Sequence, residues 1–264
     1  MENYIPESIR SIIGDRPYQV DQVGMSDSQV VCFEDMVLKI EKQRPESDNE
    51  YEMMKWLEGR LPVPKVLHFE RKDGINYLLM SRVEGEMSCT EHLMKNPENL
   101  MRIMAEGLKM LWNVDVSDYH QNFRLVDEEL EQARYRVEHG LCDMENAEPT
   151  TYGEGGFKDP ADLLHWLETH KPEEDRVFSH GDFCMPNVMV KDDHVSGFID
   201  IGRCGIADRY RDIALCYRSL DHNYKGYYGG HVYEDVDASM LFEALGMEPD
   251  WEKIRYYILL DELF

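Results

Sequence analysis

Short apolar runs separated by polar residues fill the first third of the chain, and this pattern predicts strands. The stretch from Tyr18 to Ile40 is β-like with a turn at 34–36, and two more strands are expected around Asp73-Gly74, up to Gly85. A short helix is expected over 6–13. The stretch "NEYEMMKWLEGRL" (49–61) predicts a longer helix that ends at Gly59.

From about residue 97 the pattern becomes typical of helices, which we expect over 97–114, 125–140 and 160–170 and again toward the C-terminus. Strands interrupt this region only around residues 177–200. A strand-rich first third followed by helices implies an α+β fold or two packed domains. We place the boundary near 81–86, which divides the chain into domains 1–85 and 86–264.

The composition is that of a globular protein, with 264 residues of which 42% are hydrophobic. No apolar run reaches the roughly 18 residues of a membrane span, and the N-terminus lacks the features of a signal peptide. The six cysteines are scattered without a C-x-x-C pair, which favours thiols in a reducing cytosol over a disulfide framework or a zinc site. These features predict a cytoplasmic protein.

The net charge is extreme, at −25 from 53 acidic and 28 basic residues. A surface of this sign repels nucleic acid phosphates and anionic membranes, so neither is expected as a partner. Composition alone does not distinguish a merely acidic surface from an acidic cleft that attracts a polycation. It gives no indication of an oligomeric state.

Lys39 and Glu50 are the first candidate pair for chemistry. Lys39 lies in the apolar strand pattern "MVLKI", and Glu50 shares a helix face with the apolar positions three, four and seven residues later. Glu50 is therefore expected to point inward, where a carboxylate needs a partner. Lys39 can supply that partner, although two solvated charges that never meet remain the alternative.

The stretch "SHGDFCMPNVMV" (179–190) contains an Asp and an Asn five positions apart, in a loop between two apolar strands. The same spacing occurs in the catalytic loop of phosphoryl-transfer kinases, where the Asp accepts the proton of the substrate hydroxyl and the Asn binds magnesium. Asp200 follows in "GFIDIGR", at the end of a strand and near a Gly. Each of these motifs alone is weak evidence for a kinase. Their order along the chain is much more specific evidence: Lys39, Glu50, Asp182, Asn187 and Asp200.

The motif H-G-D-x-x-x-x-N resembles that of the aminoglycoside phosphotransferase family. The stretches "LPVPKVLHFER", "VFSHGD", "VSGFID" and "YYILLDELF" resemble that family too, and within it the type III 3′-phosphotransferases. The likeness covers nearly the whole chain. It implies a two-lobed, protein-kinase-like fold that binds ATP and Mg²⁺ between its lobes and phosphorylates the 3′-hydroxyl of aminoglycoside antibiotics, which confers resistance.

The resemblance also implies roles for individual residues. Lys39 would contact the nucleotide α- and β-phosphates, Glu50 would hold Lys39, and Asp182 would be the catalytic base. Asn187 and Asp200 would hold magnesium. The loop with Ser26 would cover the phosphates, and the hinge that meets adenine would consist of Ser81, Arg82 and Val83.

One residue and one loop depart from the family pattern. Val37 stands where the type III enzymes stack an aromatic residue on adenine, which leaves the choice between ATP and GTP open. The loop 149–156 is longer than its counterpart, so the spectrum of sugars is open as well. His180 is expected to orient the loop through backbone contacts, and no base is predicted beside Cys184 or Cys204.

The apolar C-terminus "IRYYILLDELF" ends at Phe264, where the chain carboxylate adds to two acidic side chains. An ordinary packed helix would explain this apolar and acidic end. A wall of the acceptor site that binds ammonium groups by charge-assisted hydrogen bonds would explain it as well. By resemblance, the polycationic acceptor would lie against Glu145, Glu148, Arg203, Asp261, Glu262 and Phe264.

Two other functions stay open at this point. One is a kinase of the same fold that acts on another small cationic alcohol, and the other is a catalytically silent binding protein. The intact set of five motif residues argues against the silent protein. A protein kinase is not expected, because no A-P-E segment follows Asp200.

Overall fold

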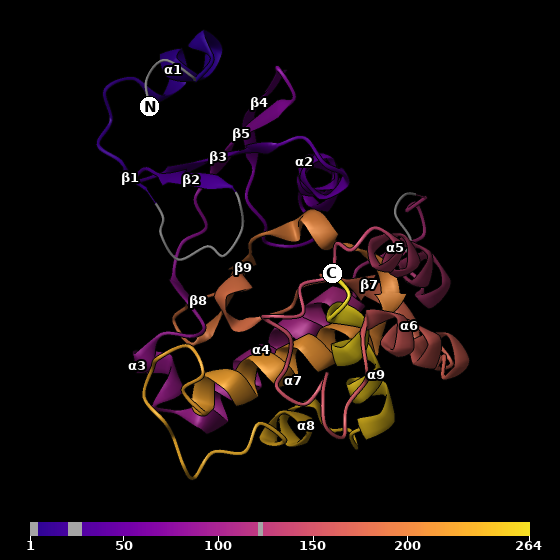
Figure 1. Cartoon of the computed structure of the whole chain (residues 1–264). Coiled ribbons are helices and arrows are strands. Elements are labelled where there is room, and N and C mark those ends of the chain that lie inside the picture. Colours follow the sequence, from indigo (N-terminus) through magenta and orange to yellow (C-terminus); the bar gives the residue numbers. More distant parts are fainter. Residues whose placement is uncertain (1–4, 21–27, 121–123) are drawn as a thin grey trace.

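The computed structural model describes residues 5–20, 28–120 and 124–264. Its N-terminal lobe contains a five-stranded antiparallel sheet in the order β1-β2-β3-β5-β4 (Figure 1). The two expected strand pairs are confirmed, with turns at 33–35 and 73–74. The strands are β1 (Gln19–Val20), β2 (Gln29–Cys32), β3 (Met36–Lys42), β4 (Val66–Lys72) and β5 (Ile75–Ser81).

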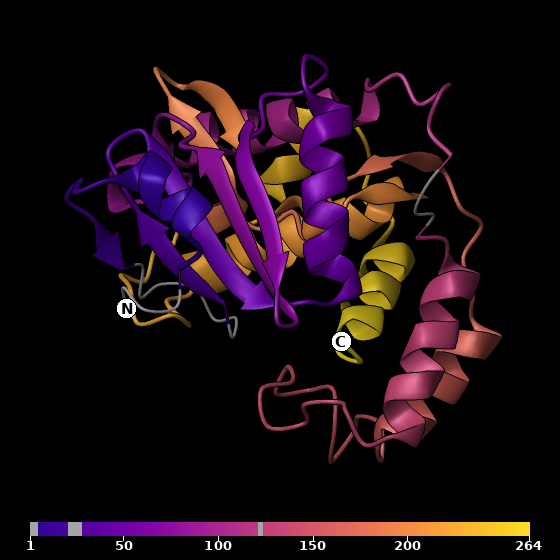
Figure 2. The ribbon, with the colours of Figure 1, turned by 90° about the horizontal axis from the view of Figure 1, so that it is seen from above.

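Side chains that alternate along the strands give this sheet two apolar faces. Leu38 and Leu79 pack with α1 in a small cluster on one face. Leu78 and Met80 belong to the main core, which also includes the apolar face of α2. Figure 2 shows α2 alongside the sheet, with the C-terminal helices behind it. The two helices of this lobe are α1 (Glu7–Ile13) and α2 (Pro45–Leu57).

Helix α2 begins at Pro45, four residues before the start that the sequence pattern predicted. Proline suits the first turn of a helix, where its missing N–H would have no partner in any case. The earlier start places Asn49 inside the helix. Its Nδ2 donates to the carbonyl oxygens of Gly202 and Cys204, at 2.9 and 3.0 Å, so α2 is joined directly to the C-terminal lobe.

Residues 82–85 lead from β5 into the larger lobe, whose helices confirm the expected pattern. Helices α4 and α7 cross its centre, with α8 against α4 and α9 against α7 (Figure 1). None of the helices among the described residues has the length and apolar character to cross a membrane. The helices are α3 (Glu91–Met94), α4 (Pro97–Trp112), α5 (Val126–Glu138), α6 (Pro160–Thr169), α7 (Arg209–Tyr224), α8 (Met240–Leu245) and α9 (Trp251–Asp261).

Two small antiparallel sheets carry the motif loops. In one, β7 pairs with β10, and in the other β8 lies between β6 and β9. The sequence pattern predicted β7, β8 and β9 but not β6 or β10, because the two residues of β6 and the stretch GIAD of β10 contain no run of β-branched or aromatic residues. The segments are β6 (Glu86–Met87), β7 (Arg176–Ser179), β8 (Val188–Lys191), β9 (His194–Phe198) and β10 (Gly205–Asp208), with 3₁₀ turns η1 (Met185–Asn187) and η2 (Ile201–Arg203).

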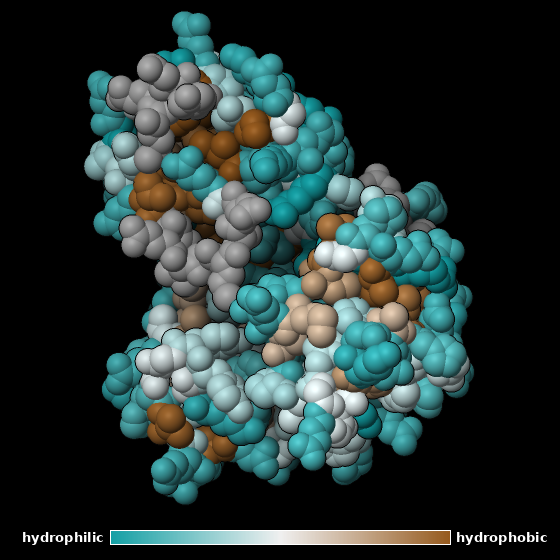
Figure 3. Space-filling model, in the orientation of Figure 1, coloured by the Kyte–Doolittle hydropathy of each residue, from teal (hydrophilic) through white to brown (hydrophobic). Residues whose placement is uncertain are grey.

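A recess separates the two lobes on the face shown in Figure 3, and its visible walls are mostly hydrophilic. The N-terminal sheet with α2 lies on one side of this recess. The ends of the small sheets and the C-terminal helices lie on the other (Figure 1). Polar side chains from both lobes can therefore meet at one place.

Candidate active site

Lys39 on β3 is at the centre of a charged cluster that joins the two lobes. Its Nζ donates to Glu50 Oε2 at 2.7 Å and to Asp200 Oδ1 at 2.8 Å. The carboxylate of Glu41 lies 3.8 Å away. Glu50 is 2% exposed on the inner face of α2, so the predicted contact between Lys39 and Glu50 is present.

The cluster keeps a positive charge among three carboxylates. Burial lowers the pKa of Lys39, but Glu50, Asp200 and Glu41 together outweigh burial and raise it, so the ammonium group stays charged. Burial raises the pKa of Glu50 to about 7 despite its contact with Lys39. Desolvation also acts to raise the pKa of Asp200, but the attraction of Lys39 is stronger and lowers it.

A tight turn after β7 positions Asp182. Gly181 has a φ of +79°, and a Cβ there would lie 2.1 Å from the carbonyl oxygen of Arg203, so only glycine fits. The backbone N–H groups of His180 and Gly181 donate to the carboxylate of Asp212, at 2.7 and 2.9 Å. Asp212 is fully buried on α7 and therefore anchors the turn from the helical core.

His180 is itself buried and is engaged with backbone through both ring nitrogens. Its Nε2 lies 3.1 Å from the carbonyl oxygen of Ile199, and its Nδ1 lies 3.3 Å from the backbone nitrogen of Asp182. The expected orienting contacts are present. Burial also raises the pKa of the Cys184 and Cys204 thiols well above the usual value, which disfavours a nucleophilic role for either.

Asp182 and Asn187 are in direct contact. The side-chain nitrogen of Asn187 donates to Oδ2 of Asp182 and to its backbone carbonyl, each at 3.0 Å. Because the amide nitrogen is used in this way, the amide oxygen is the atom of Asn187 that can face a cation. Oδ1 is the oxygen of Asp182 that Asn187 does not engage.

Asp200 has the geometry of a residue that presents a carboxylate to a ligand. It adopts the left-handed conformation, with φ 57° and ψ 53°, which Asp tolerates better than most residues. Its side chain is 53% exposed even though it contacts Lys39. The N–H of Ile199 donates to the carbonyl oxygen of Asn187 at 3.0 Å, which brings Asp200 beside Asn187. Carboxylate and amide oxygens fit the preference of Mg²⁺ for hard oxygen ligands.

The predicted hinge residues form the connection between the lobes. Ser81 ends β5, and its hydroxyl accepts the N–H of Lys65 at 2.9 Å. The backbone N–H of Arg82 donates to the carbonyl oxygen of Asp35 at 3.0 Å. The side chain of Val83 lies against Gly197 on β9. Contacts on both sides therefore fix this segment between the lobes.

Val37 is half-buried and packs against the main core from β3, two residues before Lys39. It places an aliphatic surface on the sheet face that carries the Lys39 cluster. Ser26, predicted to cover the phosphates, lies outside the described residues.

The residues predicted to bind the acceptor include Asp261, at the end of α9. Its carboxylate pairs with Arg203 at 3.5 Å and also with Arg218, a residue of α7 that the sequence analysis did not select. Burial acts to raise the pKa of Asp261, but Arg218 and Arg203 outweigh it and hold the pKa below its usual range. Asp261 is thus engaged with two arginines, which differs from the open ammonium ligand expected from the sequence.

Glu148 and Glu262, two of the residues predicted to bind the acceptor, are linked by a hydrogen bond. Glu262 accepts the backbone N–H of Glu148 at 3.2 Å, and the Glu148 carboxylate pairs with His222 on α7 at 3.1 Å. Burial raises the pKa of Glu262 to about 7. Glu145 is exposed in a neighbouring turn, where its backbone N–H donates to Asp143, so it lies farther out than the other two glutamates.

The chain terminus is anchored rather than frayed. Arg136 on α5 donates to the carbonyl oxygen of Leu263 at 2.7 Å and to a carboxylate oxygen of Phe264 at 2.6 Å. Its guanidinium also lies 5.8 Å from the centre of the Phe264 ring. These contacts place the terminal carboxylate at the same end of α9 as Glu262.

Asp212, Arg218 and His222 are site residues that sequence reasoning missed. A signal existed for Asp212, because it shares a helix face with Leu215, Cys216 and Ser219, at spacings of three, four and seven. A charge on such a face indicates a buried partner. Arg218 and His222 gave no comparable signal, because their partners come from remote segments.

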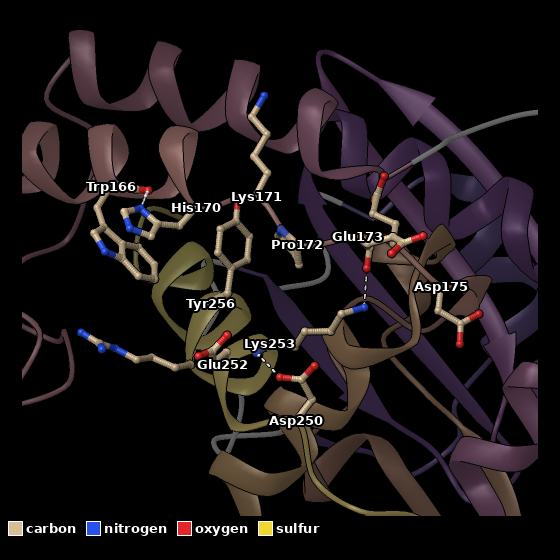
Figure 4. A pocket seen from close by; sticks show the side chains of 12 residues that line it. Trp166, His170, Lys171, Pro172, Glu173, Asp175, Asp250, Glu252, Lys253 and Tyr256 are labelled. Carbon is tan, nitrogen blue, oxygen red and sulfur yellow. Dashed lines mark hydrogen bonds between the residues drawn. The ribbon is translucent and has the colours of Figure 1, made fainter.

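A groove of about 880 Å³ lies elsewhere, between the end of α6 and the start of α9. Figure 4 shows Lys253 at its centre. The Lys253 side chain donates a hydrogen bond to the carbonyl oxygen of Glu173, and its backbone N–H donates to the carboxylate of Asp250. Lys253 also pairs with Asp208 at 2.9 Å. None of the motif residues lines this groove, so it is not the site of the Lys39 cluster.

A lysine on a strand contacts a glutamate on a helix and a carboxylate from a loop of the other lobe. This arrangement, between a strand-rich lobe and a helical lobe, defines a two-lobed, kinase-like phosphotransferase. The model of the phosphotransferase enzyme family known as APH matches residues 20–257. The chain belongs to this family.

Two curated relatives are aminoglycoside 3′-phosphotransferases. That of Enterococcus faecalis is 43% identical and that of Staphylococcus aureus 42%, and each match covers 92% of both chains. Among solved structures, aminoglycoside phosphotransferase APH(3″)-Id from Streptomyces rimosus superposes with a TM-score of 0.80 over 97% of this chain and 95% of its own, at 23% identity. A type VIII aminoglycoside 3′-phosphotransferase gives 0.79 at 24% identity, with 97% of each chain covered. These structures support the fold.

Proposed function

We propose that this protein transfers the γ-phosphoryl group of ATP to the 3′-hydroxyl of an aminoglycoside. The observation that carries the proposal is the Lys39–Glu50–Asp200 cluster next to the Asp182–Asn187 pair, in a chain whose C-terminus presents acidic groups. The curated relatives at 42–43% identity are named for this activity.

On the donor side, Lys39 binds the nucleotide phosphates, and Glu50 keeps its ammonium group in place. Ser81 and Val83 lie where the hinge meets the base, and Ser26 belongs to the phosphate-covering loop. Val37 supplies an aliphatic contact instead of a stacked ring, so ATP is the proposed donor and GTP is the alternative to be measured.

Asn187 and Asp200 are the residues that would hold Mg²⁺. Mg²⁺ held there would supply positive charge against the negative charge of the phosphates during transfer. Asp182 orients the acceptor hydroxyl through Oδ1, because Asn187 already occupies Oδ2. The hydroxyl proton moves to Asp182 late in the transfer, since a loose transition state asks mainly for positioning.

On the acceptor side, Glu262, Glu148 and the terminal carboxylate of Phe264 meet the ammonium groups, with Glu145 farther out. Asp261 acts differently, because its pairing with Arg203 and Arg218 fixes the wall rather than binding the ligand. The net charge of −25 attracts a polycation and disfavours nucleic acid as a partner.

We also propose a domain division after Gly85 and a cytoplasmic location. Residues 82–85 connect the strand-rich lobe to the helical lobe, which supports the division. The cytoplasm supplies ATP.

The test is an ADP-release assay over three matched sets of acceptors: aminoglycosides with a 3′-hydroxyl, 3′-deoxy analogues, and small amino alcohols. Only the first set should be turned over. Asp182→Asn should lower kcat by about 100-fold or more while the Kd for ATP stays unchanged. Equal turnover of 3′-deoxy analogues would refute the assigned hydroxyl. Turnover of small amino alcohols alone would favour the kinase for another cationic alcohol, and no turnover at all would favour a silent binding protein.

A further inference from the structure

Two neighbouring tyrosines stand out in the segment that follows α7. Tyr227 and Tyr228 are 60% and 63% exposed, although an aromatic ring of this size is usually well covered. The segment 225–239 runs as a long loop from the end of α7 to α8 (Figure 1). Exposed aromatic residues beside a polar site are a common sign of ligand contact.

His222 holds both tyrosines in place from the last turn of α7. The backbone N–H of Tyr227 donates to the carbonyl oxygen of His222 at 3.0 Å, and the two rings meet edge to face at 4.7 Å. The Tyr228 hydroxyl lies 3.4 Å from His222 Nδ1, with the ring centres 6.0 Å apart. The tyrosine pair is therefore attached to a fixed helix.

The same histidine connects the tyrosines to the acceptor wall. His222 Nε2 lies 3.1 Å from the carboxylate of Glu148, whose backbone N–H donates to Glu262. Partial burial raises the pKa of the Tyr228 phenol, Arg218 opposes this, and the charges of Glu148 and Asp182 add to the rise. The ring thus lies within electrostatic range of both the acceptor carboxylates and the catalytic loop.

Lys225, at the start of this segment, pairs with Asp221 at 2.8 Å. The face of a tyrosine ring carries negative potential and attracts ammonium groups, and its flat surface packs against the C–H face of a sugar. Glu148 adds a carboxylate at the edge of the same surface. This combination suits a ring that bears amino groups.

We infer that Tyr227 and Tyr228, held by His222, form an aromatic subsite that takes an additional ammonium-bearing ring of the acceptor, beyond the ring that is phosphorylated. This inference rests on the proposed function. It makes the tyrosine pair a specificity determinant. Acceptors of four rings bind more tightly because of it, whereas acceptors of two rings do not reach it.

The test compares a two-ring and a four-ring aminoglycoside with the full-length protein. Tyr228→Ala should raise the KM for the four-ring acceptor about three- to ten-fold and leave the KM for the two-ring acceptor and for ATP unchanged. Tyr228→Phe keeps the ring and should stay within about twofold of the wild type. Tyr135→Ala, which removes a 57% exposed tyrosine of α5, is the matched control and should change nothing.

An unchanged four-ring KM in Tyr228→Ala overturns the subsite, and so does an equal rise for both acceptors and ATP. Calorimetry of the four-ring aminoglycoside binding to wild type and Tyr228→Ala separates this inference from the proposed function. If the wild type binds the ligand but transfers no phosphate, the proposed function fails, while weaker binding by the variant still supports the subsite.

Discussion

The carboxylate of Asp212 and the backbone N–H of Gly181 lie 2.9 Å apart, so a residue from the first turn of α7 fixes the turn that presents Asp182. Asp212 is fully buried, and burial raises its pKa even though it accepts hydrogen bonds from two backbone N–H groups. The rigidity of the catalytic loop therefore depends on a side chain that no substrate would touch.

Asp212→Asn should slow catalysis and destabilise the fold. An amide offers one acceptor oxygen and would point its NH₂ at one of the two N–H groups, which leaves a buried donor unpaired. We expect kcat to fall at least about tenfold and the free energy of unfolding to fall by about 2–4 kcal/mol, measured by steady-state kinetics and urea denaturation. Asp127→Asn, at a carboxylate whose side chain is 79% exposed, is the control and should shift stability by less than about 0.5 kcal/mol. A wild-type kcat in Asp212→Asn would contradict the anchoring role.

Asp200→Ala should abolish magnesium-dependent turnover while the protein stays folded. Lys39 keeps its bond to Glu50 in this variant, so the charged cluster is not left unpaired. Asp192→Ala is a matched control, since Asp192 also has a positive φ, of 51°, but lies in the β8–β9 turn. Kinetics over a magnesium titration and a melting curve decide the matter. Activity of Asp200→Ala at ordinary magnesium concentrations would remove Asp200 from the metal site.

Glu262 should make stability depend on pH between about 4.5 and 7. Burial raises its pKa from 4.5 to about 7, so the folded state holds a proton that the unfolded chain has already lost in this range. Its contribution to stability is therefore fully present below 4.5 and is lost as pH rises through 7, by an amount on the order of 3 kcal/mol. Urea denaturation of wild type and Glu262→Gln at several pH values should show this loss in the wild type alone. Parallel pH curves would show that Glu262 does not titrate in this way.

Removal of Phe264 should weaken acceptor binding selectively. The deletion moves the terminal carboxylate back by one residue and removes the Phe264 carboxylate oxygen that Arg136 binds. The KM for an aminoglycoside should rise about tenfold while that for ATP stays constant. Added salt should raise the aminoglycoside KM of the wild type, since exposed charges are screened beyond about 8 Å at physiological ionic strength. If α9 has only a structural role, the truncation will instead lower the melting temperature and affect both substrates alike.

Much of the donor site could be predicted from the chain because its signals are local. Lys39 lies in an apolar strand, and Glu50 has the helical spacing of a buried position, so their contact followed from the two patterns together. The start of α2 was predicted too late, because apolar periodicity does not mark a first turn that Pro45 begins. Strands β6 and β10 were missed because their own residues form no β-branched or aromatic run, so only the pairing with β8 and β7 stabilises them.

The amino-acid sequence by itself determined the α+β class, the order of the motif residues and the acidic character of the C-terminus, because these depend on periodicity, spacing and composition. Only the tertiary structure decided which charged and polar groups far apart in the chain contact one another. It pairs Asp261 with Arg203 and Arg218, and it brings Asp212 under Gly181 and His222 between Glu148 and Tyr228. The physical reason is that an ion pair or hydrogen bond acts over a few ångströms in space, whatever the distance along the chain, and packing alone sets which groups come that close.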